Sequence, residues 1–236
     1  MSHTLHLHPA TTGSDPTASL ALSWSQRTGP SPTAMTTTTG ATASSLPDME
    51  QAPVADNRAS YLSWGLAWLI GHGAMAISSG TAPLVSLPAL LPVALLGAGV
   101  VTATVVTVTG IVRAQRGVTG PAKTAGTLLG AGWVIGFTAL FLLITALSAT
   151  AAESHLQSLL WPTGTGLVVG LMYLWGGTLQ RDLLQYALGG WLALSTTTGL
   201  FLGVPGMYWV LAVAGGGAYL AAAALEPRRR ATALSS

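Results

Sequence analysis

Within the predicted membrane spans, His72 is the one side chain that could change its charge near neutral pH, and it lies between Gly71 and Gly73. An ionisable residue inside a membrane segment is by default a candidate for function, because burying its charge in hydrocarbon is costly. Two interpretations stay open. A neutral imidazole could hydrogen-bond to a threonine or a backbone carbonyl, or the ring could contact a proton or a substrate.

Hydroxyl side chains are predicted at the same depth as this histidine. His72 follows Arg58 by 14 residues, and Ser195 follows Arg181 by the same 14 residues. Thr196 comes directly after, at the start of a run of three threonines. We therefore expect Ser195 and Thr196 to stand at the level of His72 and to be candidate binding residues with it.

Three tryptophans share one offset from a cation. Trp68, Trp133 and Trp191 each follow an arginine or lysine by ten residues. In a helix this is about 15 Å, which places them near the middle of a bilayer. Aromatic belts lie at the membrane interfaces instead, so these residues are not simple anchors. They either pack against neighbouring helices or line a shared central pocket.

The composition shows which elements must position these residues. Half of the 236 residues are apolar and 7% are charged, whereas an ordinary soluble domain is about 25% charged. From residue 58 onward the chain is a series of apolar runs long enough to cross a hydrocarbon core. We predict an all-α, polytopic membrane protein with six transmembrane helices at 60–78, 89–112, 125–147, 159–179, 183–202 and 205–225. The main alternative fuses the last two into one long helix, which Pro205 and the glycines beside it disfavour.

The positions of the cations predict the orientation. They lie before the first segment, between the second and third, between the fourth and fifth, and after the sixth, at Arg58, Arg113, Arg116, Lys123, Arg181, Arg228, Arg229 and Arg230. The other connections contain neither lysine nor arginine. By the positive-inside rule both termini are cytoplasmic, and the excess of cations gives no support for nucleic-acid binding.

Three regions are predicted along the chain. Residues 1–57 are rich in Ser, Thr and Pro and are expected to form a disordered cytoplasmic tail. Residues 58–228 form the six-helix bundle, and residues 229–236 form a short basic cytoplasmic tail. The cation offsets also favour three tandem helical hairpins, over 58–116, 123–181 and 181–230. The alternative is that periodic cations make any six-span protein look repetitive.

The sequence lacks the residues and motifs that several kinds of catalytic and metal site require. There is no cysteine, no HExxH metal motif, no nucleophile elbow and no P-loop, so we expect no enzyme, no cofactor and no metal site. Asp182 and Glu226 are placed at the cytoplasmic edge rather than inside a span. A carrier driven by intramembrane carboxylates is therefore disfavoured.

The layout is similar to that of a known group of proteins over residues 58–228. The stretches at 116–121, Arg-Gly-Val-Thr-Gly-Pro, and at 167–174, Leu-Val-Val-Gly-Leu-Met-Tyr-Leu, resemble those of small, uncharacterised six-span membrane proteins of bacteria that are loosely called permease-like. The resemblance implies a multi-pass protein of the bacterial plasma (inner) membrane, in contact with the lipid bilayer. It names no activity.

Two functions are weighed on this basis. The first is permease-like transport of a small neutral solute or a lipid, because the bundle combines mid-membrane tryptophans and hydroxyls with no fixed charge inside it. The second is a non-catalytic accessory or structural subunit that binds another membrane protein. Glycines at four-residue spacing, as in Gly166-x-x-x-Gly170, let helices approach closely, which suits a homo-oligomer or a membrane-protein partner as well as a compact bundle.

Overall fold

The computed structural model describes residues 56–151 and 154–235, and all the regular structure in these residues is helical. The α-helices are α1 (Arg58–Ser78), α2 (Leu90–Ala114), α3 (Gly120–Ala151), α4 (Ser154–Gln180), α5 (Leu183–Gly199), α6 (Gly203–Trp209) and α7 (Gly217–Ser235). A short 3₁₀ turn, η2 (Leu200–Leu202), and a π-helix, η3 (Val210–Gly216), join the last three. The all-α prediction is confirmed, and each of the six predicted segments is helical.

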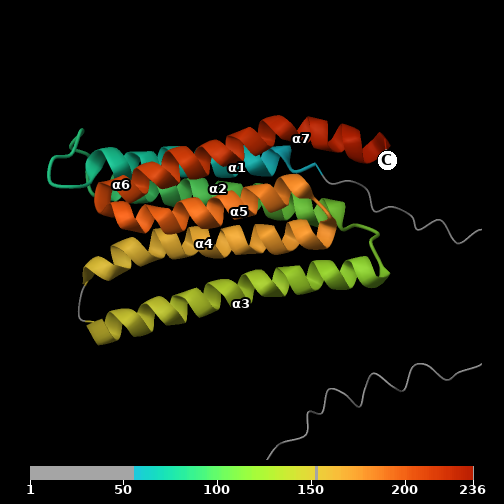
Figure 1. The fold of residues 1–236 in the computed structure, drawn as a ribbon, viewed down its shortest axis with the longest axis horizontal. Helices are drawn as coiled ribbons and strands as arrows, with labels where there is room; N and C mark the ends of the chain where they lie inside the picture. Colours follow the sequence, from blue (N-terminus) through green and yellow to red (C-terminus); the bar gives the residue numbers. More distant parts are fainter. Residues whose placement is uncertain (1–55, 152–153, 236) are drawn as a thin grey trace, which may run out of the picture. The chain divides into compact units, whose positions relative to one another are not determined.

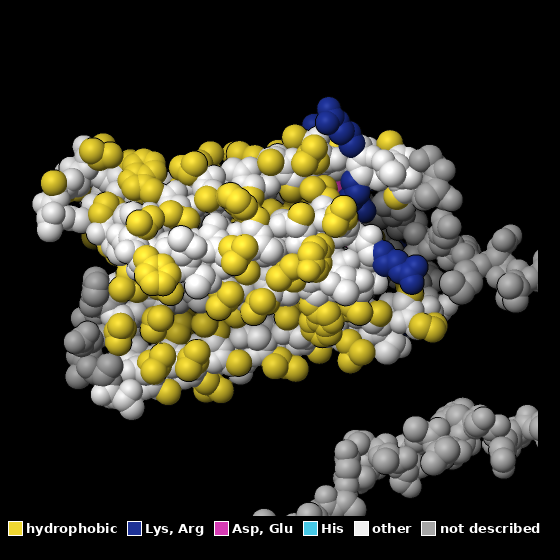
Figure 2. Space-filling view, viewed as in Figure 1, with side chains coloured by type: hydrophobic (Ala, Val, Ile, Leu, Met, Phe, Trp, Pro, Cys, Tyr) yellow, Lys and Arg dark blue, Asp and Glu magenta, His cyan; other side chains and the backbone are white. Residues whose placement is uncertain are grey.

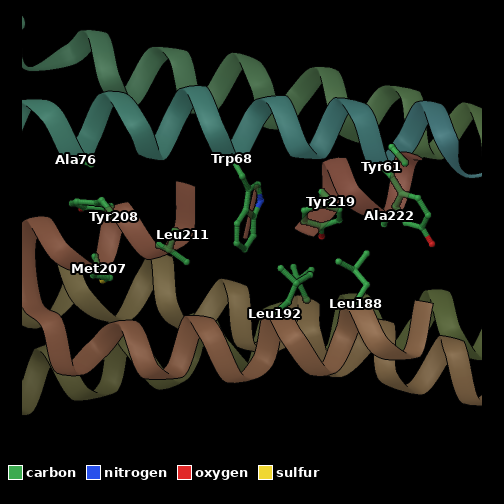
Figure 3. Packing of buried hydrophobic residues seen from close by; sticks show 12 residues of the cluster. Tyr61, Trp68, Ala76, Leu188, Leu192, Met207, Tyr208, Leu211, Tyr219 and Ala222 are labelled. Carbon is green, nitrogen blue, oxygen red and sulfur yellow. The ribbon is translucent and has the colours of Figure 1, made fainter. Parts of the chain in front are cut away.

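The helices run side by side along one direction (Figure 1). α2 packs on α1, α1 on η3 and α7, these on α5, α5 on α4, and α4 on α3. Most of the largest fully buried side chains come from the central helices α1, α5 and the η3–α7 segment, and include Tyr61, Leu192, Leu211 and Tyr219 (Figure 3). α2 and α3 are the outer helices, with only 11% of the apolar window of each buried.

The number of membrane-spanning segments differs from the prediction. Among the described residues, four segments are long and apolar enough to cross a membrane, not six: Leu90–Ala114, Gly120–Thr150, Leu156–Gln180 and Leu183–Ala233. α1 has 21 residues but is not among them, because its serines, tryptophans and His72 lower its hydropathy. Its neighbours α2, α6, η3 and α7 cover much of it, so α1 needs less apolar surface than an outer helix does.

The last of the four segments is 51 residues long and contains a reversal of the chain. α5 ends at Gly199, and α7 returns alongside it (Figure 1). Gly203 has φ +57° at the bend, a value that favours glycine because a Cβ would be strained there. Val204 follows with extended angles, φ −94° and ψ 131°. The segment is thus a helical hairpin and not one continuous helix.

The consecutive helix pairs α1–α2, α3–α4 and α5–α7 each pack together, as three tandem hairpins require. α4 and α5 lie in different predicted hairpins, yet their backbones also touch. A Cβ at Gly170 would lie 2.5 Å from the amide nitrogen of Ala193, and one at Gly189 would lie 2.7 Å from the carbonyl oxygen of Gly170. These glycines give the bundle a contact that hairpins alone would lack. Whether the hairpins are true repeats stays a prediction.

The exterior is apolar along the helices and charged at one end. Leucine, valine and phenylalanine side chains cover the sides, and Phe201, Leu90 and Leu194 are at least 72% exposed. On the face drawn in Figure 2, the Lys and Arg side chains gather at the end where α7 finishes. We call this the charged end; α1 begins and α4 ends there (Figure 1). A surface of this kind suits helices surrounded by lipid, where the backbone is satisfied within each helix.

The structure describes little of the predicted N-terminal tail and most of the predicted C-terminal tail. Of the tail at 1–57, only residues 56–57 are described, so its predicted disorder lies outside the described residues. At the other end, α7 does not stop near residue 225 or 228 but continues to Ser235. The basic segment that was predicted as a separate tail therefore begins as helix. Arg229 there reaches back to Glu226, three residues earlier.

Candidate functional site

A π-helical segment interrupts the last helix of the bundle. Val210–Gly216, which we call the π segment, has the sequence Val-Leu-Ala-Val-Ala-Gly-Gly and lies between α6 and α7. Leu211, Ala212, Gly215 and Gly216 in it are buried. π-Helical turns are rare and occur often at functional sites. Nothing in the sequence predicted a π-helix here.

Trp191 of α5 forms a hydrogen bond to the backbone of the π segment. Its indole nitrogen donates a hydrogen bond of 3.0 Å to the carbonyl oxygen of Ala214. A π-helical turn disturbs the usual pairing of carbonyls, so an outside donor stabilises it. The ring itself is 55% exposed. This tryptophan thus packs at the side of the segment and does not line an interior pocket.

Trp68 of α1 also lies against the π segment. A Cβ at Gly215 would lie 2.6 Å from Cζ3 of the indole, so the ring sits directly on the glycine backbone. Figure 3 shows Trp68 pointing from α1 into the core between Leu211 and Tyr219. The ring is 4% exposed. Two of the predicted tryptophans, Trp68 and Trp191, therefore meet the π segment from different helices.

His72 lies one turn beyond Trp68 on α1 and is 5% exposed. Its ring is 5.3 Å from that of Trp68, edge to face, and 6.3 Å from that of Tyr208 on α6, stacked. The imidazole interacts with the backbone of Trp68, but its Nδ1 has no hydrogen-bond partner among the described residues. A buried polar atom without a partner is uncommon in native proteins and calls for an explanation. It is the strongest local sign of function among the predicted residues.

The structure does not bring the predicted hydroxyls to this histidine. The Ser195 hydroxyl donates to the carbonyl oxygen of Leu192 at 3.3 Å, and the Thr196 hydroxyl donates to the same oxygen at 2.7 Å. Thr196 is fully buried against α4, where a Cβ at Gly166 would lie 2.9 Å from its own Cβ. Back-bonding to the same helix is common for such residues. Both hydroxyls are thus satisfied within α5, and Thr196 also packs against α4.

Trp133 of α3 belongs to a second aromatic group. Its ring stacks on Phe137 at 6.0 Å and meets Tyr173 of α4 edge to face at 6.1 Å. Tyr173, Tyr61 of α1 and Tyr219 of α7 form a triangle with ring centroids 5.8 to 6.5 Å apart. We call these three residues the tyrosine triad. Sequence reasoning missed the triad, although Tyr173 and Tyr219 occupy matching positions in the fourth and sixth predicted spans.

The aromatic groups form one continuous core. Tyr219 lies 5.7 Å from Trp68, edge to face. The contacts therefore run from Trp133 through the tyrosine triad to Trp68, and on to His72. Aromatic side chains dominate the energetics of cores and of ligand pockets alike. The core joins four helices across the region that the π segment occupies.

A buried ionic group lies at the charged end, next to the tyrosine triad. Glu226 is fully buried and Asp182 is 8% exposed. Arg229 lies between them: its Nη1 is 3.1 Å from Asp182 Oδ2, and its Nε and Nη2 donate to Glu226 at 2.8 and 2.5 Å. We call these three residues the inner cluster. Two carboxylates and one guanidinium leave one negative charge.

Asp182 and Glu226 lie at one end of the bundle, as the sequence predicted, and both are buried there. Asp182 caps α5 by accepting a hydrogen bond from the Gln185 amide at 3.1 Å. Glu226 accepts one of 3.0 Å from the Asn57 amide. The start of α1, the start of α5 and the middle of α7 thus meet at this point. The capping position of Asp182 was visible in the sequence as the residue before an apolar run; the burial of Glu226 was not.

A separate apolar groove lies between α3, α4 and α5. It has a volume of about 450 Å³ and is lined mainly by leucines, with Thr163 and Thr197 as its hydroxyl-bearing residues. The Thr163 hydroxyl donates to the carbonyl oxygen of Leu159. No predicted site residue lines this groove. Because its walls are apolar, the groove suits a lipid chain and no polar chemistry.

Comparison with known proteins adds nothing to this geometry. No family model matches the chain, and no curated protein or solved structure matches it.

Proposed function

We propose that the chain is a permease-like protein of a bacterial plasma membrane, which moves a small solute along the aromatic core past the π segment. One observation carries the proposal: irregular backbone lies in the middle of the last hairpin, beside a buried histidine whose Nδ1 has no partner among the described residues. Non-helical backbone at membrane depth is tolerated where it is buried in protein or lines a cavity. Discontinuous helices are also where many transporters bind their substrates.

The proposal includes six crossings of the membrane. α1 has 21 residues, about 31 Å at 1.5 Å per residue, which matches the hydrocarbon core. The segment Leu183–Ala233 turns back at Gly203 and so supplies two crossings. With six crossings, both termini lie on the side of the charged end. The positive-inside rule makes that side cytoplasmic.

A second function has its own support in the structure. α2 and α3 pack chiefly on one neighbour each, and glycines on their surfaces, such as Gly97, Gly110 and Gly130, have no atom near the position of a Cβ. Helices can approach closely at such positions. An accessory subunit that binds another membrane protein, or a homo-oligomer, would use these faces. Single-particle mass measurement in mild detergent separates the two, since a lone monodisperse monomer contradicts the accessory function.

Accessibility of the π segment tests the transport proposal. The chain has no cysteine, so Leu211→Cys introduces a unique thiol at a site that is 0% exposed. Leu194→Cys is the matched control, because Leu194 is 72% exposed on the apolar exterior, where lipid excludes charged reagents. We expect a charged methanethiosulfonate to modify Leu211→Cys in native membranes and to leave Leu194→Cys unmodified. Equal resistance of both thiols would mean that the core only packs.

A further inference from the structure

The tyrosine triad and the inner cluster lie side by side and combine two features that attract the same kind of ligand. Tyr61 is close enough to Asp182, Glu226 and Arg229 to interact with all three electrostatically. Its side chain leaves α1 beside Ala222 (Figure 3), one turn of α7 before Glu226. Tyr61 is 1% exposed, and its hydroxyl has no hydrogen-bond partner among the described residues. A buried hydroxyl therefore stands without a partner beside a buried negative charge.

The charge of the inner cluster is not balanced within it. A buried charge is costly unless a partner compensates it, and Arg229 compensates only one of the two carboxylates. The neighbouring cations Arg181 and Arg228 are exposed to solvent. The Arg230 side chain pairs with Asp56, at 2.7 Å. One more positive charge at this site would therefore neutralise the inner cluster.

We propose that the tyrosine triad and the inner cluster bind a monovalent organic cation with an alkylated ammonium group. This inference rests on the proposed function and names the substrate class of that carrier. Tyrosine faces attract ammonium groups through cation–π interaction, and rings arranged around a point recognise quaternary ammonium ligands. The neutral solute expected from the sequence was inferred because no charge was placed inside the bundle, and the buried Glu226 removes that reason.

An inorganic cation fits this site poorly. Each carboxylate oxygen of the inner cluster already has a partner: Asp182 Oδ1 the Gln185 amide, Asp182 Oδ2 and Glu226 Oε2 the guanidinium of Arg229, and Glu226 Oε1 both the guanidinium and the Asn57 amide. Hard cations such as Ca²⁺ require 6–8 oxygen ligands. A diffuse ammonium needs only the aromatic faces and the nearby negative charge.

Arg229 is the resident cation of the site in this structure. Its side chain is 19% exposed, so the guanidinium can reach water at the charged end. The tyrosine rings fill the space between themselves, at 5.8 to 6.5 Å. An arriving cation therefore has to separate the rings and compete with Arg229 for the carboxylates. Removing the positive charge of Arg229 is expected to tighten ligand binding, which a purely structural ion pair would not do.

The test compares two probes of one shape. Benzyltrimethylammonium and its uncharged isostere neopentylbenzene differ only in the charged centre, and binding to the detergent-purified full chain is measured by saturation-transfer NMR. We expect the ammonium probe to bind about tenfold more tightly than the isostere, which corresponds to one or two cation–π contacts. Glu226→Gln and Tyr173→Leu are each expected to weaken it by about tenfold. Tyr186→Leu, on a side chain that is 47% exposed, is the control and leaves the affinity unchanged.

The results of these binding measurements test separate parts of the proposal. Tighter binding in Arg229→Gln supports the resident-cation argument; unchanged or weaker binding in a folded Arg229→Gln protein overturns it. If that variant does not fold, the contrast between Tyr173→Leu and Tyr186→Leu still decides. Equal affinity for the two probes overturns the substrate class alone, provided that Leu211→Cys is reactive. Specific binding of the ammonium with an unreactive Leu211→Cys keeps the site and rejects transport.

Discussion

The contact between Trp68 and the π segment leads to a sharp prediction about two glycines of the last helix. A Cβ at Gly215 would lie 2.6 Å from Cζ3 of Trp68, whereas a Cβ at Gly217 has no atom within 4 Å. Gly215→Ala therefore forces the indole ring to move by about 1 Å within a core that is already filled, and overpacking of this kind costs about 1–3 kcal/mol. Gly217→Ala adds a methyl group in open space and, by helix propensity, gains up to about 1 kcal/mol.

Thermal unfolding in detergent measures this difference. For a chain of this size, each kcal/mol corresponds to about 2–4 °C in the unfolding midpoint, so Gly215→Ala is expected to lower the midpoint by about 2–12 °C. The midpoint is read from the monodisperse fraction that remains after heating. Gly217→Ala should leave it unchanged or slightly higher. A midpoint for Gly215→Ala equal to that of the unmodified chain would refute the packing described for Trp68.

A double substitution identifies the partner in this contact. Trp68→Leu removes the ring that the new methyl group meets, so adding Gly215→Ala to Trp68→Leu should cost less than it does alone. The coupling energy is expected to be about 1 kcal/mol or more, as for residues in direct contact. Additive effects would show that Gly215→Ala acts elsewhere, for example on the π-helical backbone itself.

Three further predictions follow from the same structure. Gly189→Ala should destabilise the chain by about 1–3 kcal/mol, because its Cβ would meet the backbone of α4, and Gly190→Ala, whose Cβ would have an ordinary contact at 3.7 Å, should not; the thermal midpoint compares the two. Arg229→Ala should cost about 3 kcal/mol, since it removes the cation that pairs with two buried carboxylates, and SDS unfolding followed by circular dichroism measures the loss. In sealed cells, an impermeant thiol reagent should modify Leu84→Cys and should reach Thr119→Cys only after permeabilisation; labelling of both from outside contradicts six crossings.

The sequence predicts the helices well because apolar length and punctuation are local properties. All six predicted segments are helical, and Gly203 and Pro205 mark the reversal in the last hairpin. The number of spans is harder to predict, because a hydropathy scale treats every helix as if lipid alone surrounded it. α1 is covered by other helices and is not apolar enough to count as a span by hydropathy, so its sequence alone does not show its place in the bundle.

The site was predicted only in part. His72 and Trp68, both predicted as candidate site residues, are buried in contact with each other, and the sequence did not predict this contact. Ser195 and Thr196 donate their hydroxyls to their own helix, because a hydroxyl in a helix has a carbonyl within reach one turn back. The spacing of residues along a helix predicts how deep a side chain lies in the membrane. The direction in which that side chain points depends on how the helix is rotated against its neighbours.

The inner cluster was missed for a different reason. Asp182 and Glu226 flank predicted spans, where charged residues are usually solvated. Their burial depends on the starts of α1 and α5 meeting the middle of α7 at Arg229, and that arrangement is a property of the packed bundle. No single segment of the sequence records it. The π segment is similar, since its sequence of small and aliphatic residues would equally suit an α-helix.

The central claim is that the region around the π segment is reached by solute from both sides of the membrane. In sealed, inside-out and right-side-out vesicles, the rate at which a charged methanethiosulfonate modifies Leu211→Cys measures this access directly, with Leu194→Cys as the lipid-facing control. The proposed transport predicts that Leu211→Cys reacts from either side and Leu194→Cys from neither. A Leu211→Cys thiol that stays unmodified in both kinds of vesicle, in a protein shown to be folded, would contradict it.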